Sequence, residues 1–230
     1  MSKVTLLCSD TVNPNINLPG VESLQDIIAY AARVSNPSNQ LNTDTNDKLI
    51  KYLIDNDHWS PLEMVGATLE IITTRDIARQ ILRHRSFSFQ EFSQRYADPT
   101  KDLSFVEREA RLQDHKNRQN SINMDVNDEK QKQIAAQWHI RQTRHNKNAQ
   151  DNYSWAIENG IAKEQARSVL PEGNTVSKLY MKGTIRSWVH YVNLRSGHGT
   201  QKEHREIALG CAEALSGVFP LINNFVEKET

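Results

Sequence analysis

Residues 83–96 read RHRSFSFQEFSQRY and set arginine and histidine among aromatic rings. Every permanent cation in this stretch is an arginine, at positions 83, 85 and 95. The planar guanidinium group suits bidentate contact with a phosphate or with the edge of a base. A phosphate beside a flat ring describes a nucleotide, so the stretch predicts nucleotide binding. The rings of Phe87, Phe89 and Phe92 fit core or interface positions more readily than stacking platforms.

Two helices are predicted around this stretch. The first begins near residue 75, with apolar residues at 77, 78, 81 and 82 and with Arg75, Arg79 and Arg83 on the opposite face. A solvated charged face is the alternative interpretation of these arginines. Ser88 and Glu91 have the spacing of a capping box, which predicts a second, short helix over 89–95. The N-terminus of such a helix offers free amides to an anion.

The composition limits the class of protein. Only 37% of the 230 residues are hydrophobic, which suits long polar helices or subunits that complete one another's cores. Lys plus Arg equals Asp plus Glu at 28 each, so the bulk charge does not indicate a nucleic-acid or membrane-surface partner. No run approaches a membrane span or a signal peptide. Cys8 and Cys211 are predicted to be packed thiols outside any disulfide framework, so we expect a cytoplasmic protein.

Apolar periodicity predicts a helix-rich chain with few strands. Strands are predicted over 3–9 and 64–74, with a short one near 103–106, and further helices over 23–35, 47–57, 128–159, 162–170, 184–195 and 201–217. Gly160 ends the long polar helix, whose predicted inner stripe is Ile134, Trp138, Ala149, Tyr153 and Ala156. Residues 97–130 show the least structure. Because the strands do not form βαβ units, we predict one α/β domain of the α+β type over 1–230, helix-rich around a mostly antiparallel or mixed sheet.

Several kinds of chemistry find no support in the sequence. Neither GxGxxG nor GxxxxGK[ST] occurs, which excludes a Rossmann fingerprint and a P-loop. His198 and His204 are too isolated from other ligands to indicate zinc, so no metal is expected. Ser93 has neither a GxSxG elbow nor an evident base, and it is therefore a better phosphate ligand than nucleophile.

RHR followed by seven residues and a serine, as in RHRSFSFQEFS, resembles the signature of the flavin-dependent thymidylate synthases (ThyX). Further blocks in the same order resemble that family: AARVS (31–35), HWSPLE (58–63), ARQILRHR (78–85), SQRY (93–96), ARSVLP (166–171), RSWVHYVNLR (186–195) and QKEHREIA (201–208). The resemblance covers essentially the whole chain, except that 97–130 is hard to place.

The resemblance implies a homotetramer with FAD held where subunits meet and with active sites assembled from several chains. It implies transfer of a one-carbon unit from 5,10-methylenetetrahydrofolate to dUMP, with the hydride supplied through FAD and NADPH, to give dTMP. No protein nucleophile is implied, because an arginine stabilises the ionised uracil ring. Neither nucleic acid nor membrane is expected as a partner.

The resemblance also assigns residues. Positions that match the family's flavin contacts are Ser60, Arg83, His84, Arg85, Glu91, Thr184, Arg186 and His190. Positions that match its dUMP contacts are Gln80, Arg83, Glu91, Phe92, Ser93, Gln94, Arg95, Arg167 and Arg195. Arg195 matches the arginine that acts on uracil N3 and is the predicted catalytic residue. His58 matches a histidine near the flavin, with a role in positioning or in folate access. Ser60 is predicted to cap a helix as well, in a capping box with Glu63.

The chain departs from some family members at a few of these positions. Met64 stands where some have histidine, Thr184 and His190 where some have asparagine, and Gln94 where some have glycine. These departures bear on affinity rather than on class. Two alternatives stay open: a nucleotide- or RNA-binding module without catalysis, and the same chemistry on another pyrimidine nucleotide.

Overall fold

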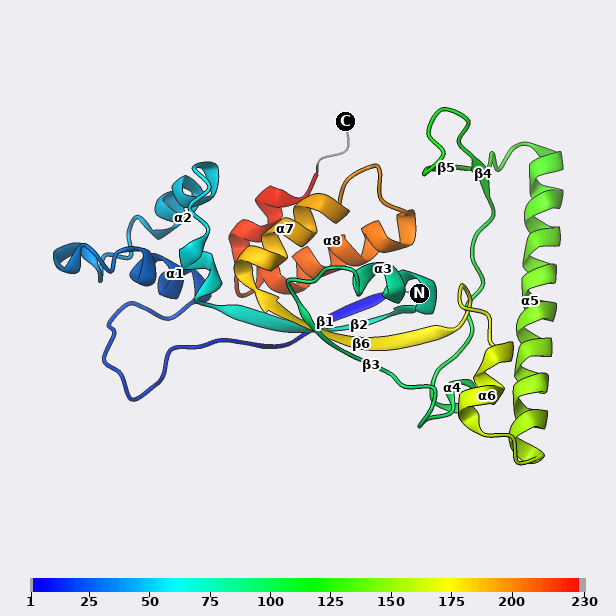
Figure 1. The fold of residues 1–230 in the computed structure, drawn as a ribbon. Coiled ribbons are helices and arrows are strands. Elements are labelled where there is room, and N and C mark those ends of the chain that lie inside the picture. The colour runs from blue at the N-terminus through cyan, green and yellow to red at the C-terminus, as the bar shows by residue number, and fades with distance from the viewer. Residues whose placement is uncertain (1, 228–230) are drawn as a thin grey trace.

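The computed structural model describes residues 2–227 and contains a four-stranded antiparallel sheet. The strand order is β1 (Lys3–Ser9), β2 (Gly66–Thr74), β6 (Val176–Thr184) and β3 (Ser88–Glu91). The central pair β2–β6 stays in register over its whole length, from Gly66 opposite Thr184 to Thr74 opposite Val176. The predicted α+β class and antiparallel sheet are therefore confirmed (Figure 1).

One face of the sheet carries the main hydrophobic core. Helices α3 (Arg75–Ile81), α7 (Ile185–Arg195) and α8 (Lys202–Ser216) cover this face (Figure 1). Their apolar stripes bury Ile77, Trp188 and Ile207 completely against strand residues such as Leu69 and Leu179. In each helix apolar residues recur every three or four positions. They therefore form one apolar side, which packs on the sheet.

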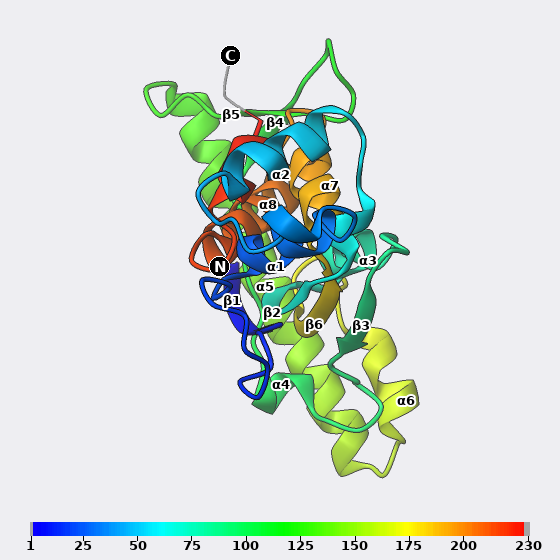
Figure 2. The same ribbon diagram turned by 90° about the vertical axis from the view of Figure 1, so that its left-hand side faces the viewer.

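Two groups of elements extend from opposite ends of this core (Figures 1 and 2). At one end lie α1 (Leu24–Ala32), α2 (Asn46–Asp55) and the short helices η1 (Pro37–Asn39) and η2 (Ser60–Glu63). At the other lie α4 (Pro99–Asp102), the hairpin β4 (Arg111–Gln113) with β5 (Ser121–Asn123), α5 (Glu129–Glu158), α6 (Lys163–Ala166) and η3 (Arg167–Val169). The described chain closes with η4 (Pro220–Phe225) against α8 and α7.

The long polar helix α5 has the predicted boundaries. Asp128 caps its N-terminus, and Gly160 follows its C-terminus at φ 76°, a left-handed conformation that glycine adopts without steric cost. Tyr153 and Ala156 are buried in a second, smaller core. Ile134 and Trp138, however, are each 44% exposed, so the predicted inner stripe is wrong for the N-terminal half of the helix. Both side chains line an open hollow together with Arg111 and Met124 rather than a packed core.

Three local predictions are wrong. Ser60 is the first residue of η2 rather than its cap, because Trp59 takes the cap position and no side chain bonds there. Residues 88–91 form the edge strand β3 rather than opening a helix, because their backbone pairs with Lys182 to Leu179 of β6. Cys8 is exposed on β1, whereas Cys211 is buried as predicted.

Candidate active site

The RHR motif forms the turn between α3 and β3. Phe87 anchors this turn because it is only 8% exposed and packs edge-on against Trp188, with ring centroids 4.7 Å apart. Arg83 and Arg85 remain exposed. Neither guanidinium group hydrogen-bonds or pairs with any residue of the part of the chain that the structure describes. The turn therefore presents two permanent cations to the outside of the chain.

His84, between these arginines, points to Arg195 at the last turn of α7. Arg195 donates a hydrogen bond from Nε to Nε2 of His84 over 2.9 Å. Arginine can only donate, so Nε2 of His84 carries the lone pair and the ring is neutral. Burial and the charge of Arg195 lower the pKa of His84 from 6.5 to about 4. The two terminal amino groups of Arg195 have no hydrogen-bond partner among residues 2–227.

Behind this pair lies a buried polar layer that sequence reasoning did not predict as part of the site. His204 is 0% exposed and contacts Oε1 of Gln80 at 3.2 Å and the hydroxyl of Tyr191 at 3.1 Å. Burial, together with Arg195 and His84, lowers the pKa of His204 from 6.5 to about 3. The only sequence signal is a histidine at an inward position of the α8 stripe, in line with Ile207 and Ala208.

A second set of predicted residues meets at α6. Arg95 lies 3.4 Å from the carboxylate of Glu164, and Arg167 donates from Nε to the carbonyl of Glu164 over 3.3 Å. Ser93 accepts the backbone N–H of Arg95 at 3.4 Å. Gln94 is 4% exposed, and its buried Nε2 has no hydrogen-bond partner. An unpaired buried amide is costly unless a ligand accepts its hydrogen bond.

The strand β3 connects these two sets. The Glu91 carboxylate accepts a hydrogen bond from Ser177 at 2.9 Å and lies 3.6 Å from the guanidinium of buried Arg75. Phe92 donates its backbone N–H to Lys178 at 2.8 Å. Glu91 thus holds β3 to β6 and to α3, and Arg75 belongs to the fold rather than to a charged outer face.

A third set lies at the start of α7. Thr184 caps this helix and accepts the N–H of Ser187 at 3.3 Å. Arg186 forms an ion pair with Glu63, which follows Ser60 in η2. The rings of His190 and Trp59 have centroids 4.3 Å apart. Burial and then Arg186 lower the pKa of His190, against the opposing charge of Asp57. His58 lies edge-on to Tyr52 with centroids 6.2 Å apart.

One chain does not bring all three sets together. The RHR turn contacts the start of α7, because Ser187 donates from Oγ to the carbonyl of Ser86 over 3.2 Å. Arg186 and Arg195 are nevertheless nine positions apart on α7, which separates their Cα atoms by roughly 14 Å. The α6 set lies at the far end of β3 from the RHR turn (Figure 1).

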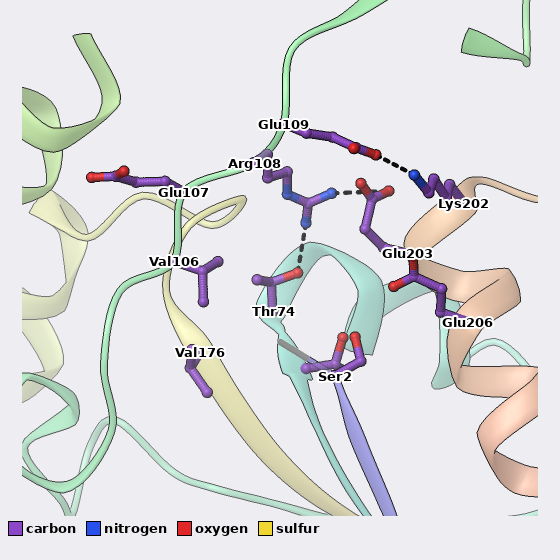
Figure 3. Close-up of a pocket in the computed structure, with 11 residues that line it drawn as sticks. Ser2, Thr74, Val106, Glu107, Arg108, Glu109, Val176, Lys202, Glu203 and Glu206 are labelled. Carbon is purple, nitrogen blue, oxygen red and sulfur yellow. Dashed lines mark hydrogen bonds and ion pairs between the residues drawn. The ribbon is translucent and has the colours of Figure 1, made fainter. Parts of the chain in front are cut away.

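A well-formed cavity of about 220 Å³ lies elsewhere, between α8 and the segment around Arg108 (Figure 3). Its cations are already paired: Arg108 lies 3.4 Å from Glu203, and Lys202 lies 2.5 Å from Glu109. None of the predicted site residues lines this cavity. Because unpaired arginines are the better mark of an anion site, we place the candidate site at the RHR turn. Within residues 2–227, no helix is long and apolar enough to cross a membrane, and no cluster of His, Cys, Asp or Glu is arranged to hold a metal.

The chain belongs to the family of thymidylate synthase complementing proteins, whose family model matches residues 21–221. A probable flavin-dependent thymidylate synthase of Paramecium bursaria Chlorella virus 1 is 47% identical over 203 residues, 88% of this chain and 90% of that protein. The flavin-dependent thymidylate synthase of Synechocystis sp. is 50% identical over 204 residues, 87% of this chain and 88% of that protein. The resemblance carried by the RHR signature is confirmed.

The fold has a counterpart among solved structures. The crystal structure of the UMP/dUMP methylase PolB from Streptomyces cacaoi bound with 5-Br dUMP has a TM-score of 0.77 at 24% sequence identity. The match covers 98% of this chain and 94% of that chain, so the whole described fold is shared.

Proposed function

We propose that this protein is a flavin-dependent thymidylate synthase that converts dUMP to dTMP with Arg195 as the catalytic residue. The observation that carries the proposal is the fixed guanidinium of Arg195, held at Nε by neutral His84 with its terminal amino groups free. The names of the relatives favour catalysis over a binding module without chemistry.

The unpaired hydrogen-bond donors of the site fit a nucleotide and a flavin as ligands. Arg83 and Arg85 offer unpaired guanidinium groups, and Gln94 offers a buried amide without a partner. Phosphates and the polar edge of a flavin ring are acceptors that satisfy such donors. We assign the flavin to Ser60, Arg83, His84, Arg85, Glu91, Thr184, Arg186 and His190, with His58 in positioning or folate access.

We assign dUMP to Gln80, Arg83, Glu91, Phe92, Ser93, Gln94, Arg95, Arg167 and Arg195. Arg195 lies at the pyrimidine edge in this assignment, where a permanent cation lowers the pKa of the ring N3–H and favours the anion. The anionic ring is the stronger nucleophile at C5, so no protein thiol has to attack it. Buried Cys211 fits this, because burial raises the pKa of its thiol and suppresses the thiolate.

His84 keeps Arg195 in the orientation that this role requires. Because its Nε2 accepts a hydrogen bond from Arg195, His84 can take up a proton there only by breaking that bond. Bound FAD supplies the hydride for reduction, with NADPH as the reductant and 5,10-methylenetetrahydrofolate as the one-carbon donor.

We propose a homotetramer of single-domain chains, each spanning 1–230, with active sites shared between subunits. The support is the separation of the α6 set from the RHR turn, at opposite ends of β3, and of Arg186 from Arg195 along α7. The exposed Ile134, Trp138 and Trp155 of α5 add apolar surface that a subunit contact would bury. Free thiols at Cys8 and Cys211 support a reducing, cytoplasmic location.

An absorbance spectrum of the purified protein tests the proposal first. We expect a flavin band that NADPH bleaches under anaerobic conditions, faster with dUMP present. Adding the folate should then yield dTMP. An assay with UMP in place of dUMP tests whether the enzyme carries out the same chemistry on another pyrimidine nucleotide. A colourless protein that takes up no FAD and makes no dTMP would refute the proposal.

A further inference from the structure

Gln80 belongs to a continuous series of side-chain hydrogen bonds. The series runs from Glu203 through Gln201 to Gln80, and from Gln80 through His204 to Tyr191. Gln201 donates to the Glu203 carboxylate over 2.9 Å, and Gln80 donates to Oε1 of Gln201 over 2.8 Å. His204 follows at 3.2 Å from Gln80 and 3.1 Å from the Tyr191 hydroxyl.

The direction of every bond is set by the first group. Glu203 is a carboxylate held by Arg108 and Arg111, and an ionised carboxylate can only accept. Gln201 must therefore present its NH₂ group to Glu203 and its oxygen to Gln80. Gln80 in turn presents its NH₂ group to Gln201 and its oxygen to His204. His204 must then donate from Nδ1 and accept at Nε2 from Tyr191.

This order fixes the tautomer of a fully buried histidine. His204 is neutral, since burial and the charge of Arg195 lower its pKa to about 3. Tyr191, the last member of this hydrogen-bond series, also contacts the RHR turn. Its ring packs edge-on against His84 with ring centroids 4.9 Å apart. His84 is the residue that holds Arg195. The buried layer thus hydrogen-bonds to Gln80 and makes only a ring contact with His84.

The layer leaves one donor of Gln80 free. Its Nε2 carries two hydrogens, of which Gln201 accepts one, and no residue within 2–227 accepts the other. Gln80 itself is half-buried. If the carboxamide turned over, its oxygen would face the oxygen of Gln201 and its NH₂ group would face Nδ1–H of His204. Both bonds would be lost.

We propose that His204 is a positioning residue that, together with Gln201, locks the carboxamide of Gln80 with its free N–H toward the bound pyrimidine nucleotide. The proposal rests on the proposed function, because it takes Gln80 as a nucleotide contact. His204 touches neither substrate nor cofactor in this assignment and acts only through Gln80.

Leucine and asparagine make a matched pair of substitutions, because they have nearly the same shape. In H204N the side-chain amide replaces Nδ1–H as the donor to Gln80, whereas H204L has no donor. We expect H204L to raise the Kd of dUMP about tenfold, and its KM in parallel, with FAD content unchanged. H204N should stay within about threefold of the wild type. Equal affinity in the two variants would overturn the proposal.

A double-mutant cycle separates positioning from general loosening of the core. The proteins are wild type, H204L, Gln80→Ala and the double variant, each as the FAD-bound full chain. Titration calorimetry with dUMP gives a readout that does not depend on turnover. We expect Gln80→Ala to weaken dUMP about tenfold and H204L to add less than about twofold on that background. Independent, multiplying losses would show that His204 does not act through Gln80.

The outcomes also distinguish the two proposals. A wild-type protein that binds no dUMP and makes no dTMP refutes the proposed function. A wild-type protein that does both, with a cycle that shows no coupling, refutes only the role of His204. Should H204L fail to fold, H204M replaces it, because methionine also offers no donor to Gln80. Equal dUMP affinity of H204M and H204N would overturn the proposal.

Discussion

Burial of neutral His204 makes the stability of the protein depend on pH in a way that can be calculated. The pKa of this histidine falls from 6.5 in the unfolded chain to about 3 in the native one. Between these values the unfolded state binds the proton and the native state does not, so protonation favours unfolding. The stabilisation is complete above about pH 6.5 and declines as the pH falls toward 3.

The magnitude follows from linkage. At about pH 5 the native histidine is almost entirely neutral, so the loss depends on the unfolded pKa of 6.5 alone. The free energy of unfolding then drops by about 2 kcal/mol between about pH 7.5 and pH 5. His84 acts in the same direction, but its half-exposed ring is screened by solvent and its share is smaller.

Urea unfolding of the wild type and of H204N over this pH range isolates the contribution of His204 to the free energy of unfolding. Carboxylates and His84 titrate in both proteins, so their effects cancel in the difference. Protein and FAD concentrations must be equal throughout, because ligands and self-association shift apparent stability. We expect the wild type to lose about 2 kcal/mol more than H204N. Parallel pH profiles would show that His204 is not held neutral by the fold.

Three further predictions concern the RHR turn and its partners. Arg195→Ala should lower kcat at least about 100-fold with FAD still bound, as judged by the flavin absorbance; loss of FAD would contradict the catalytic assignment. Arg83→Ala should weaken both FAD and dUMP about tenfold, yet change the free energy of unfolding by less than about 0.5 kcal/mol, since no described residue pairs with it. An unchanged dUMP Kd would refute the shared contact. Gly183→Ala should cost about 1–3 kcal/mol in urea unfolding, because a Cβ there would lie 2.4 Å from the ring of Phe87; Gly173→Ala, with no atom within 4 Å, is the matched control.

Local signals were sufficient to predict most helices. Gly160 predicts the end of α5, and the structure adds Asp128 as the cap at its start; both signals involve only neighbouring residues. The helices α7 and α8 follow from apolar stripes that the core then buries. Helix ends and apolar stripes are encoded within one or two helical turns of sequence. Tertiary packing then stabilises these helices without changing their boundaries.

The helix predicted over 89–95 is wrong because long-range pairing outweighs a local signal. Ser88 and Glu91 satisfy the spacing of a capping box, whose stabilisation is about 1 kcal/mol. The same residues pair with β6 almost a hundred positions later, and Glu91 joins Arg75 and Ser177 in that setting. A ladder of backbone hydrogen bonds with a buried ion pair outweighs one cap. No local pattern contains that partner strand.

The buried layer around His204 was beyond sequence reasoning for a similar reason. Its members come from α3, α7 and the start of α8, and Gln80 lies 124 positions from His204. Each residue taken alone fits an ordinary helix position. Only the packing of three helices on one sheet turns them into a single hydrogen-bonded chain. The family resemblance supplied Gln80 and Arg195, and its block QKEHREIA (201–208) contains Gln201 and His204, but it assigned these two residues no role.

Arg83 and Arg85 of the RHR motif differ in their pairing from the arginines that hold the fold. Arg75 is paired with Glu91 and Glu172, and Arg108 with Asp76 and Glu203. Arg83 and Arg85, by contrast, have no partner in the described chain. A cation left unpaired in solvent adds little to folding, but it is free to bind an incoming anion without first breaking an internal pair. Under the proposed assignment Arg83 and Arg85 bind ligands, whereas the paired Arg75 and Arg108 hold the fold.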